Sequence, residues 1–416
     1  MMRAYPRHIV NLRGESFKAL LDCVLAKQII NGPQIKRFEE EFSKYTGSSF
    51  AIGISQARLG LIAVLKSLGL EKGDEVILPA YNFHIIAEVI IKSGLTPVFA
   101  DIDPDTYNID PVLIKNKINQ KTKAIIVTHM FGQPAEMDEI LILGKENNIK
   151  VIEDCAHSLG SEYKGKKTGT MGDAGIFSFS LGKNMPCFGG GMITTNDRKI
   201  YETLKEYIDE SGAPQLKSVF KNIFEFSAGY LITATFLFTF FVFPLIRLLD
   251  IFGIDIMDLK KKEVLPPENI TNFDTLPLKL LNIQAAVGME HFKKNDFLDS
   301  KRYENSLLLT NNLSGLNGIK LPSKRHKSNY LYYKVRVEDK CSFRKQLLRK
   351  GIDTSKRSEM SDCSGLSAFA EFNSDYPNSI AIKDNLIELP NNHYLDARDI
   401  EHISKSIKQV LSLKHG

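Results

Sequence analysis

Short apolar runs alternate with amphipathic stretches from about residue 48 to residue 195, and this alternation limits the possible folds more than any other feature. Short strands that are apolar on both faces are typical of parallel sheets covered by helices on both sides. The pattern predicts an α/β fold with a mostly parallel sheet that binds ligands at the carboxyl ends of its strands. The expected strands are Phe50–Ile54, Glu75–Leu78, Thr96–Ala100, Ala124–His129, Lys150–Ile152, Ala174–Ser178 and Gly191–Thr195, and the expected helices are Leu59–Leu70, Ile85–Ser93, Ile109–Ile118 and Met137–Asn147.

The chain after about residue 285 has the pattern of a second, smaller α+β unit. We predict a large domain over residues 1–270, with an insertion at about residues 215–262, and a small domain over residues 271–416. The elements expected in the second unit are a helix Ile283–Tyr303, a strand Tyr330–Val337, a helix Ser342–Lys350 and a closing helix Ala397–Leu413.

The segment Phe226–Ile246 holds no charged residue over 21 positions, and basic residues flank it on both sides. About 20 apolar residues are enough to cross a bilayer, so the segment has the length of a transmembrane helix. The alternative is a buried core helix, but this segment is apolar on every face, which exceeds what a half-buried helix needs. The sequence therefore predicts membrane contact through Phe226–Ile246.

A single crossing would place the two halves of the chain on opposite sides of the membrane. Because both halves are expected to build one fold, the alternatives are a hairpin bent near Pro244, a re-entrant segment or an interfacial helix. Of these the sequence favours interfacial or re-entrant attachment. The first residues contain no long apolar stretch, so a cleaved secretory signal is not expected. We expect a cytoplasmic protein attached to the inner face of the cell membrane.

The composition argues against two other classes of protein. Lysine and arginine number 54 against 49 aspartates and glutamates, and the excess is spread along the chain, so nucleic-acid binding is not expected. The five cysteines are scattered without the spacing of metal ligands, which predicts reduced thiols and no metal site.

Two segments that follow expected strands carry side chains suited to chemistry. Asp154 lies just past an apolar strand, where a carboxylate needs a cationic partner. Lys183 follows the strand that ends at Ser178 and precedes the glycine run Gly189–Gly191. Pyridoxal phosphate needs such a lysine for a Schiff base and such a carboxylate to keep its pyridine nitrogen protonated. Spacing alone also fits a surface lysine and a helix-capping aspartate.

Further motifs run in a fixed order through most of the chain: Asn31–Phe42, Lys72–Pro79, Pro97–Asp110, Thr122–Ile126, His129–Pro134, Ile152–Asp154, Gly172–Gly175, Ser178–Asn184, Asn282–Gly288 and Leu389–Pro390. On these motifs the chain resembles the sugar aminotransferases of the DegT/DnrJ/EryC1/StrS family. The resemblance implies a fold of the aspartate-aminotransferase type, pyridoxal 5'-phosphate as the cofactor of the large domain, and a homodimer.

The resemblance also implies roles for individual residues. Lys183 matches the lysine that forms the Schiff base and then moves a proton between the donor and the cofactor, and Asp154 matches the partner of the pyridine nitrogen. His157 matches the residue beside the ring oxygen of the cofactor. Phe83 matches an aromatic ring that stacks on the cofactor and Ser178 a hydroxyl that binds its phosphate, although plain core packing is the alternative for both.

Three segments depart from the family pattern. The Ser-Gly-Thr phosphate turn is replaced by Ser55–Arg58, where backbone amides at Ala57 and the side chain of Arg58 are still expected to bind phosphate. A segment that reaches the partner subunit in the family is here Pro277–Lys279, and a loop near the substrate is Ser355–Met360. The lysine and aspartate are kept while the substrate contacts differ, which indicates retained chemistry on a changed acceptor.

The sequence therefore predicts an aminotransferase that moves an amino group, with glutamate as the expected donor, onto a keto-sugar for cell-surface polysaccharide. The apolar insertion is expected beside the entrance to the active site, which adds a lipid-linked keto-sugar to the possible acceptors beside a nucleotide-linked one. One alternative is a non-catalytic, membrane-attached partner or regulator on the same scaffold. A sugar dehydratase is a weaker alternative, because dehydrating relatives replace the lysine with histidine.

Overall fold

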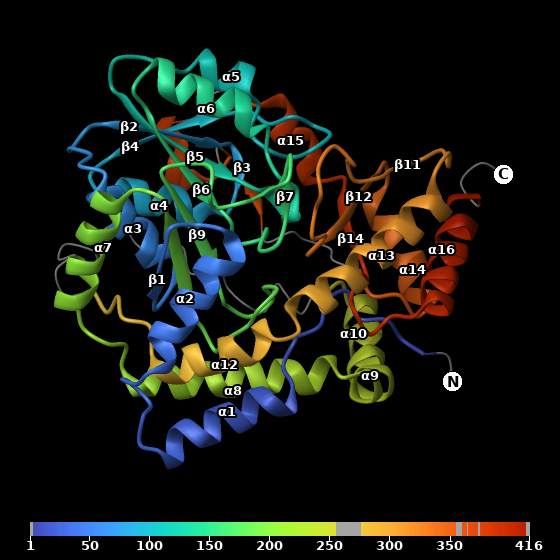
Figure 1. The fold of residues 1–416 in the computed structure, drawn as a ribbon. Helices are drawn as coiled ribbons and strands as arrows, with labels where there is room; N and C mark the ends of the chain where they lie inside the picture. Colours follow the sequence, from blue (N-terminus) through green and yellow to red (C-terminus); the bar gives the residue numbers. More distant parts are fainter. Residues whose placement is uncertain (1–2, 255–275, 355–359, 364, 373–374, 413–416) are drawn as a thin grey trace.

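The structure is a computed structural model that describes residues 3–254, 276–354, 360–363, 365–372 and 375–412. In these residues the seven expected strands form one sheet in the order β1-β10-β9-β6-β5-β2-β4 (Figure 1). Only β10 runs antiparallel to its neighbours, so the prediction of a mostly parallel sheet is confirmed. The strands are β1 (Phe50–Ile54), β2 (Glu75–Pro79), β4 (Thr96–Ala100), β5 (Thr122–Thr128), β6 (Lys150–Asp154), β9 (Ala174–Ser178) and β10 (Gly191–Thr195).

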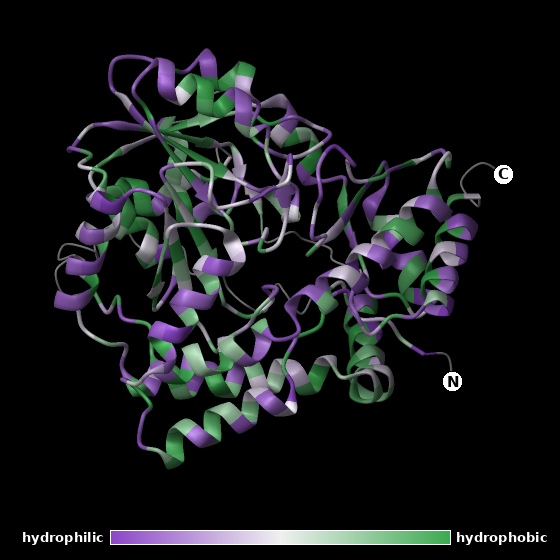
Figure 2. Cartoon of the chain, in the orientation of Figure 1, coloured by the Kyte–Doolittle hydropathy of each residue, from purple (hydrophilic) through white to green (hydrophobic). Residues whose placement is uncertain are grey.

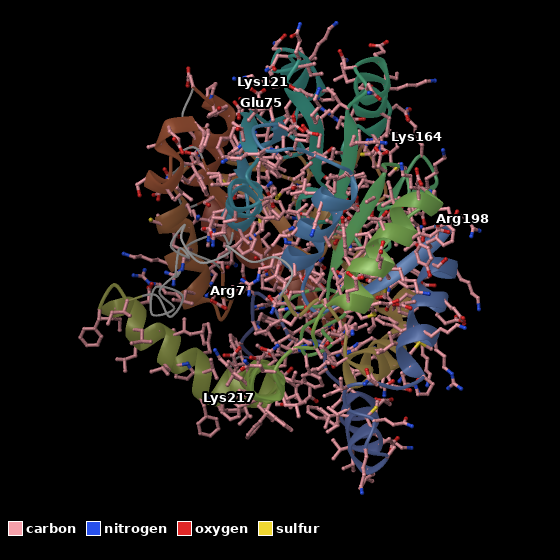
Figure 3. The ribbon with its side chains drawn as sticks, turned by 90° about the vertical axis from the view of Figure 1, so that its left-hand side faces the viewer. Arg7, Glu75, Lys121, Lys164, Arg198 and Lys217 are labelled. Atoms are coloured by element: carbon pink, nitrogen blue, oxygen red, sulfur yellow. The ribbon has the colours of Figure 1, made fainter. Side chains whose placement is uncertain are left out.

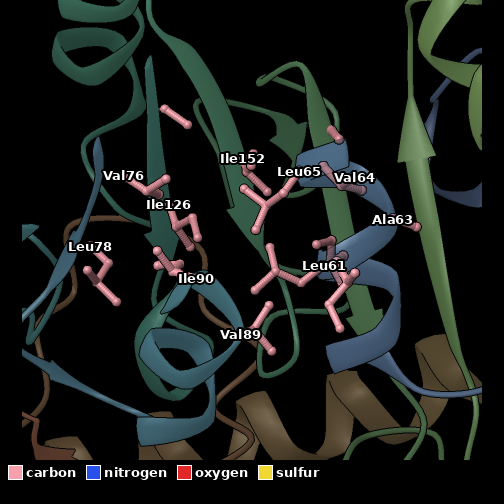
Figure 4. Packing of buried hydrophobic residues seen from close by; sticks show 14 of the residues in the cluster. Leu61, Ala63, Val64, Leu65, Val76, Leu78, Val89, Ile90, Ile126 and Ile152 are labelled. Atoms are coloured by element: carbon pink, nitrogen blue, oxygen red, sulfur yellow. The ribbon is translucent and has the colours of Figure 1, made fainter. Parts of the chain in front are cut away.

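Helices cover both faces of this sheet because successive side chains of each strand point to opposite sides. On β2, Val76 and Leu78 pack beneath α3 (Ala57–Ser67), α4 (His84–Lys92) and α7 (Arg198–Glu210), as Figure 4 shows for α3 and α4. Ile77 faces the other side, toward α5 (Pro111–Lys115) and α6 (Met137–Glu146). The expected helix Ile109–Ile118 is shorter in the structure, because Asp110 caps the Val112 amide and Pro111 begins the first turn.

The smaller unit contains, among the described residues, an antiparallel sheet of β11 (Ile319–Lys320), β12 (Tyr333–Val337) and β14 (Leu386–Leu389). It packs on α13 (Asn295–Leu313), α14 (Lys340–Arg349) and α16 (Ala397–Ser412). The predicted domain boundary at residue 270 lies outside the described residues. Further elements are α2 (Gln34–Thr46), α15 (Pro377–Lys383), and the short strands β3 (Tyr81–Asn82), β7 (Glu162–Tyr163), β8 (Lys166–Lys167) and β13 (Ser361–Asp362).

Two expected elements of the smaller unit have different bounds. The single helix expected over Ile283–Tyr303 is two helices, α12 (Asn282–Phe292) and α13, separated at Lys294, whose backbone leaves the helical region. The strand expected from Tyr330 begins only at Tyr333, because Tyr330 has a left-handed backbone with φ of 46° that a strand does not accept.

The apolar segment is helical but bent. It lies within a bent run of helices made of α8 (Leu216–Thr233), α9 (Thr235–Leu237), a π-helical turn (Phe238–Val242) and α10 (Phe243–Ile251). This run, called segment α8–α10 below, lies beside α1 (Gly14–Leu25) at the lower edge of Figure 1. Among the described helices, none alone is long and apolar enough to cross a bilayer, whereas α8 and the helix that follows pass that test together, across a bend of 64°. The alternative of a bend near Pro244 does not match the structure. The break is at Ala234, which has extended backbone angles, and Pro244 fits the first turn of α10.

The packing of β5 beneath α3 and α4 gives a stability prediction. Ile126 is fully buried there, so Ile126→Ala should leave a cavity and lower the free energy of unfolding by about 2–4 kcal/mol in urea denaturation. Ile142 on α6 is 55% exposed, and Ile142→Ala should cost less than about 0.5 kcal/mol. Equal losses in the two variants would contradict the described packing.

Candidate active site

The side chains singled out in the sequence meet at the carboxyl edge of the large sheet. Asp154 is the last residue of β6, and it pairs across the sheet with Thr128 of β5 and Ile176 of β9. Ser178 ends β9 on the same edge. Parallel strands bring their carboxyl ends together, so this convergence follows from the topology.

The carboxylate of Asp154 is held by its own strand end. Its Oδ1 accepts a hydrogen bond of 3.0 Å from the Ala156 amide, and Oδ2 lies 3.5 Å from the Thr128 hydroxyl. Burial raises the pKa of Asp154 above its usual value, while the Ala156 amide and the positive charge of Lys183 oppose that increase. A cationic group beside this carboxylate would therefore be strongly favoured.

Lys183 lies in the loop after β9, between glycines with left-handed backbones. Gly182 has φ of 87°, and Gly189 and Gly190 have φ of 101° and 96°, conformations that favour glycine. The charge of Lys183 acts on both Asp154 and His157, lowering the pKa of each. The structure thus brings the three principal predicted residues together.

His157 is 3% exposed, and neither of its ring nitrogens has a hydrogen-bond partner among the described residues. Its ring lies parallel to that of Phe131, with centroids 6.2 Å apart, and edge-on to Tyr332 at 5.1 Å. Burial, reinforced by the charges of Lys183 and Lys334, holds the pKa of His157 well below its usual value. A buried imidazole with two unpaired nitrogens indicates that a polar ligand belongs beside it.

The start of α3 and the glycine run form a cradle for an anion. Gln56 has an extended backbone and bridges to Gly190, so helix α3 begins at Ala57 directly beside the loop that follows Lys183. A Cβ on Gly191 would lie 3.3 Å from the Ala57 amide nitrogen. Helix N-termini with close-packed glycine backbones are suited to phosphate. The Arg58 guanidinium, however, donates to the Gln56 side chain at 2.7 Å.

Ser178 lies beside a second hydroxyl, whereas the ring of Phe83 is partly exposed. The Ser178 hydroxyl is 3.0 Å from that of Ser180, so a pair of hydroxyls lines the end of β9. Phe83 precedes α4 and is 37% exposed, so its ring is not part of the core. Packing in the core, the alternative for Phe83, is therefore not what the structure shows.

The structure describes one of the two remaining segments that depart from the family pattern completely and the other only at its last residue. Pro277–Lys279 lies against the replaced phosphate turn: Ser55 donates its amide to Leu278 O at 2.8 Å and its hydroxyl to Pro277 O. Of the loop Ser355–Met360, only Met360 is among the described residues, and it is buried.

Four neighbours of the site were not found from the sequence. Thr128 and Asn82 lie at strand ends beside Asp154, and the Thr128 hydroxyl donates to Asn82 Oδ1 at 3.3 Å. Tyr332 donates to Gly182 O at 3.2 Å, and Lys334 forms a buried ion pair of 2.7 Å with Glu388. Thr128 was predictable from its position at a strand end, whereas Tyr332 and Lys334 come from the smaller unit without any local signal.

A family model, described as the DegT/DnrJ/EryC1/StrS aminotransferase family, matches residues 11–230 and 247–408. The curated relatives include GDP-perosamine synthase of Escherichia coli O157:H7, 37% identical over 48% of this chain and 56% of the relative. A dTDP-3-amino-3,6-dideoxy-alpha-D-galactopyranose transaminase of Aneurinibacillus thermoaerophilus is 39% identical over 47% of this chain and 54% of the relative. The chain spans about half the length of the curated relatives it matches.

Solved structures share the fold across nearly the whole chain. The aminotransferase PseC of Helicobacter pylori, involved in the biosynthesis of pseudoaminic acid, has a TM-score of 0.78 at 23% identity and covers 99% of this chain and 100% of its own. An aminotransferase from Psychrobacter cryohalolentis has a TM-score of 0.79 at 22% identity, with both chains covered completely. At these identities the likeness establishes the fold, and the expected α/β architecture of the sugar aminotransferases is confirmed.

The depressed pKa of His157 gives a pH prediction. Between pH 7 and pH 5 the unfolded chain gains a proton at this position and the folded protein does not, so the free energy of unfolding falls as pH falls. Relative to His157→Gln, the protein should lose up to about 1.4 kcal/mol per pH unit below pH 6.5, measured by urea denaturation at pH 7 and pH 5. Parallel pH dependence of the two proteins would contradict a buried, neutral His157.

Proposed function

Because the chain belongs to the DegT/DnrJ/EryC1/StrS aminotransferase family, we propose that it is a pyridoxal-phosphate-dependent enzyme that transfers an amino group from glutamate to a keto-sugar. The observation that carries the proposal is the position of Lys183, whose charge acts on both Asp154 and His157 at the carboxyl edge of the sheet. The product would enter cell-surface polysaccharide.

The residues present fit the cofactor. The first turn of α3 at Ala57 and the hydroxyls of Ser178 and Ser180 would hold its phosphate, and the unpaired nitrogens of His157 would meet its ring oxygen. The exposed ring of Phe83 would cover one face of the pyridine ring and exclude water from it. When bound, pyridoxal phosphate supplies a carbonyl carbon for a Schiff base and a ring that accepts electrons from the donor's α carbon.

Asp154 and Lys183 would share the proton chemistry. The Asp154 carboxylate would hold a proton on the pyridine nitrogen, and that cationic partner would offset the burial that raises its pKa. The Lys183 amine would take the proton from the donor's α carbon, and later protonate the sugar oxygen that leaves as water. The hydrogen bond from Tyr332 to Gly182 O would fix the loop that carries this amine.

The acceptor is proposed as a keto-sugar because one relative is named as a transaminase of a dTDP-linked amino sugar and another as a synthase of GDP-perosamine. A transaminase forms such an amino group from a ketone. Assays with nucleotide-linked and with lipid-linked keto-sugars distinguish the two carriers. The departures at Pro277–Lys279 and at Ser355–Met360 support an acceptor that differs from those of the relatives.

Visible spectroscopy tests the first half of the reaction. The protein reconstituted with pyridoxal phosphate should show a cofactor absorption band that glutamate bleaches, while Lys183→Ala should keep the fold and give neither the same band nor bleaching. Two results would contradict the enzyme proposal: a protein that takes up no cofactor, or a Lys183→Ala spectrum equal to that of the parent. Either result would favour a non-catalytic partner or regulator.

A second variant tests Asp154. Asp154→Asn removes the charge that holds the ring proton while keeping the shape of the side chain, so the rate of bleaching by glutamate should fall by about a hundredfold or more. Single-turnover bleaching by glutamate measures the loss, and absorbance of bound cofactor confirms that the site is still loaded. An unchanged bleaching rate would overturn the role given to Asp154.

A further inference from the structure

The outer side of the bent segment α8–α10 is an exposed apolar face. Its members are each more than half exposed, and they come from all parts of the segment: Phe224, Leu231, Phe236, Phe241, Leu248 and Ile251. Figure 2 shows the hydrophobic colour running along α8, α9 and α10 and onto α1 at the lower edge of the molecule. An apolar surface of this extent is uncommon on a monomeric protein and indicates an interaction site.

We propose that this apolar face docks the protein on the surface of an anionic phospholipid bilayer, with α8–α10 lying in the interface between headgroups and acyl chains. The inference goes beyond the transfer reaction and does not depend on it. Helices that bind in this way have one apolar face, one face directed away from the bilayer, and basic residues close to the headgroups.

The inner side of the segment is fixed to the body of the protein. Phe226 packs on Phe188 with ring centroids 5.6 Å apart, and the Asn222 amide donates to Phe188 O at 3.1 Å. Beyond the bend, the Thr239 hydroxyl accepts the Ala4 amide at 3.3 Å, and Asp250 is paired with Arg344. The segment is therefore held in place from one side while its other side stays exposed.

The chemistry of the face favours a bilayer over a protein partner. Protein interfaces combine apolar area with hydrogen bonds and a polar rim. Here Phe226–Ile246 contains no charged residue, and the hydroxyls of Ser227 and Thr233 donate to carbonyl oxygens one turn earlier in their own helix. What the face offers to a partner is hydrocarbon and aromatic surface, which suits acyl chains.

Basic residues stand at both ends of the apolar segment. Lys217 lies on the first turn of α8 and Arg247 lies on α10, while Lys221 on the second turn of α8 is 3.8 Å from the carboxylate of Glu225. Figure 3 labels Lys217 at the base of the segment, which projects from the body of the molecule. Lysines and arginines near a bilayer surface are attracted to anionic lipid headgroups. This charge complementarity selects an anionic bilayer as the occupant.

The family match leaves out part of the same segment. It stops at residue 230 and resumes at residue 247, so the residues between them lie outside the pattern that defines the family. They include Leu231, Phe236 and Phe241 of the apolar face. The added residues thus supply the middle of the exposed surface, while its two ends, at Phe224 and at Leu248 and Ile251, lie in the matched parts. The matched part of α8 also supplies the inner contact to Phe188.

The face can be probed directly because the chain contains no tryptophan. Phe236 on the apolar face and Phe297 on α13 are exposed to almost the same degree, 66% and 68%. Phe236→Trp and Phe297→Trp therefore give matched single-tryptophan proteins. Vesicles of phosphatidylcholine with one quarter phosphatidylglycerol should shift the emission of Phe236→Trp to shorter wavelength, and brominated lipid should quench it; Phe297→Trp should respond to neither.

Vesicle flotation of the full chain gives an independent readout. The double variant Phe236→Ser, Phe241→Ser should bind these vesicles at least about tenfold more weakly than the parent. Phe297→Ser should bind like the parent, and raised salt should weaken binding of both. Circular dichroism checks that each variant is folded.

Three results would overturn the proposal. They are a parent protein that does not float with vesicles, a Phe236→Trp emission that ignores brominated lipid, and a double variant that binds vesicles normally but changes its oligomeric state. The last result would assign the face to a contact between copies of this chain.

Discussion

Two consecutive acidic residues at the end of β6 organise the site, because strand geometry sends their side chains to opposite faces of the sheet. Asp154 faces the loop of Lys183, while Glu153 is fully buried on the other side. Glu153 accepts hydrogen bonds from the amides of Gly169, Met171 and Gly172, and it lies 2.9 Å from His129 Nε2.

The bonds of Glu153 fix the loop that leads into β9, and β9 in turn carries the loop of Lys183. Burial alone would raise the pKa of Glu153, but the contact with His129 and the hydrogen bonds from these amides hold that pKa below its usual value. The carboxylate therefore stays charged inside the protein, where losing its partners would be expensive. The position of the proposed catalytic lysine thus depends on a buried carboxylate that faces away from it.

Residues 7–11 link the loop of Lys183, the smaller unit and the apolar segment. Arg7 forms an ion pair with Asp353 at 2.8 Å, and Asn11 donates to Asn184 O at 3.3 Å, directly after Lys183. Between them, the Val10 amide donates to the Thr233 hydroxyl at the bend of the apolar segment. Two consecutive residues, Val10 and Asn11, therefore contact the proposed membrane-docking segment and the residue next to the proposed catalytic lysine.

Much of the large sheet could be predicted from the sequence, because its buried strands are apolar runs bounded by turn residues. Phe50–Ile54, Thr96–Ala100 and Gly191–Thr195 have the bounds expected for them. The convergence of Asp154 and Lys183 followed from strand order together with the family resemblance. The break at Ala234 could not be predicted, since alanine favours helix and only tertiary contacts at the bend decide its backbone angles.

The central claim is that Lys183 is the residue to which pyridoxal phosphate becomes attached. Reduction of the reconstituted protein with borohydride, followed by peptide mass spectrometry, tests it most directly. The account predicts a pyridoxyl phosphate adduct on the peptide that contains Lys183 and on no other lysine in comparable yield. An adduct on a different lysine, or no adduct after reduction, would contradict it.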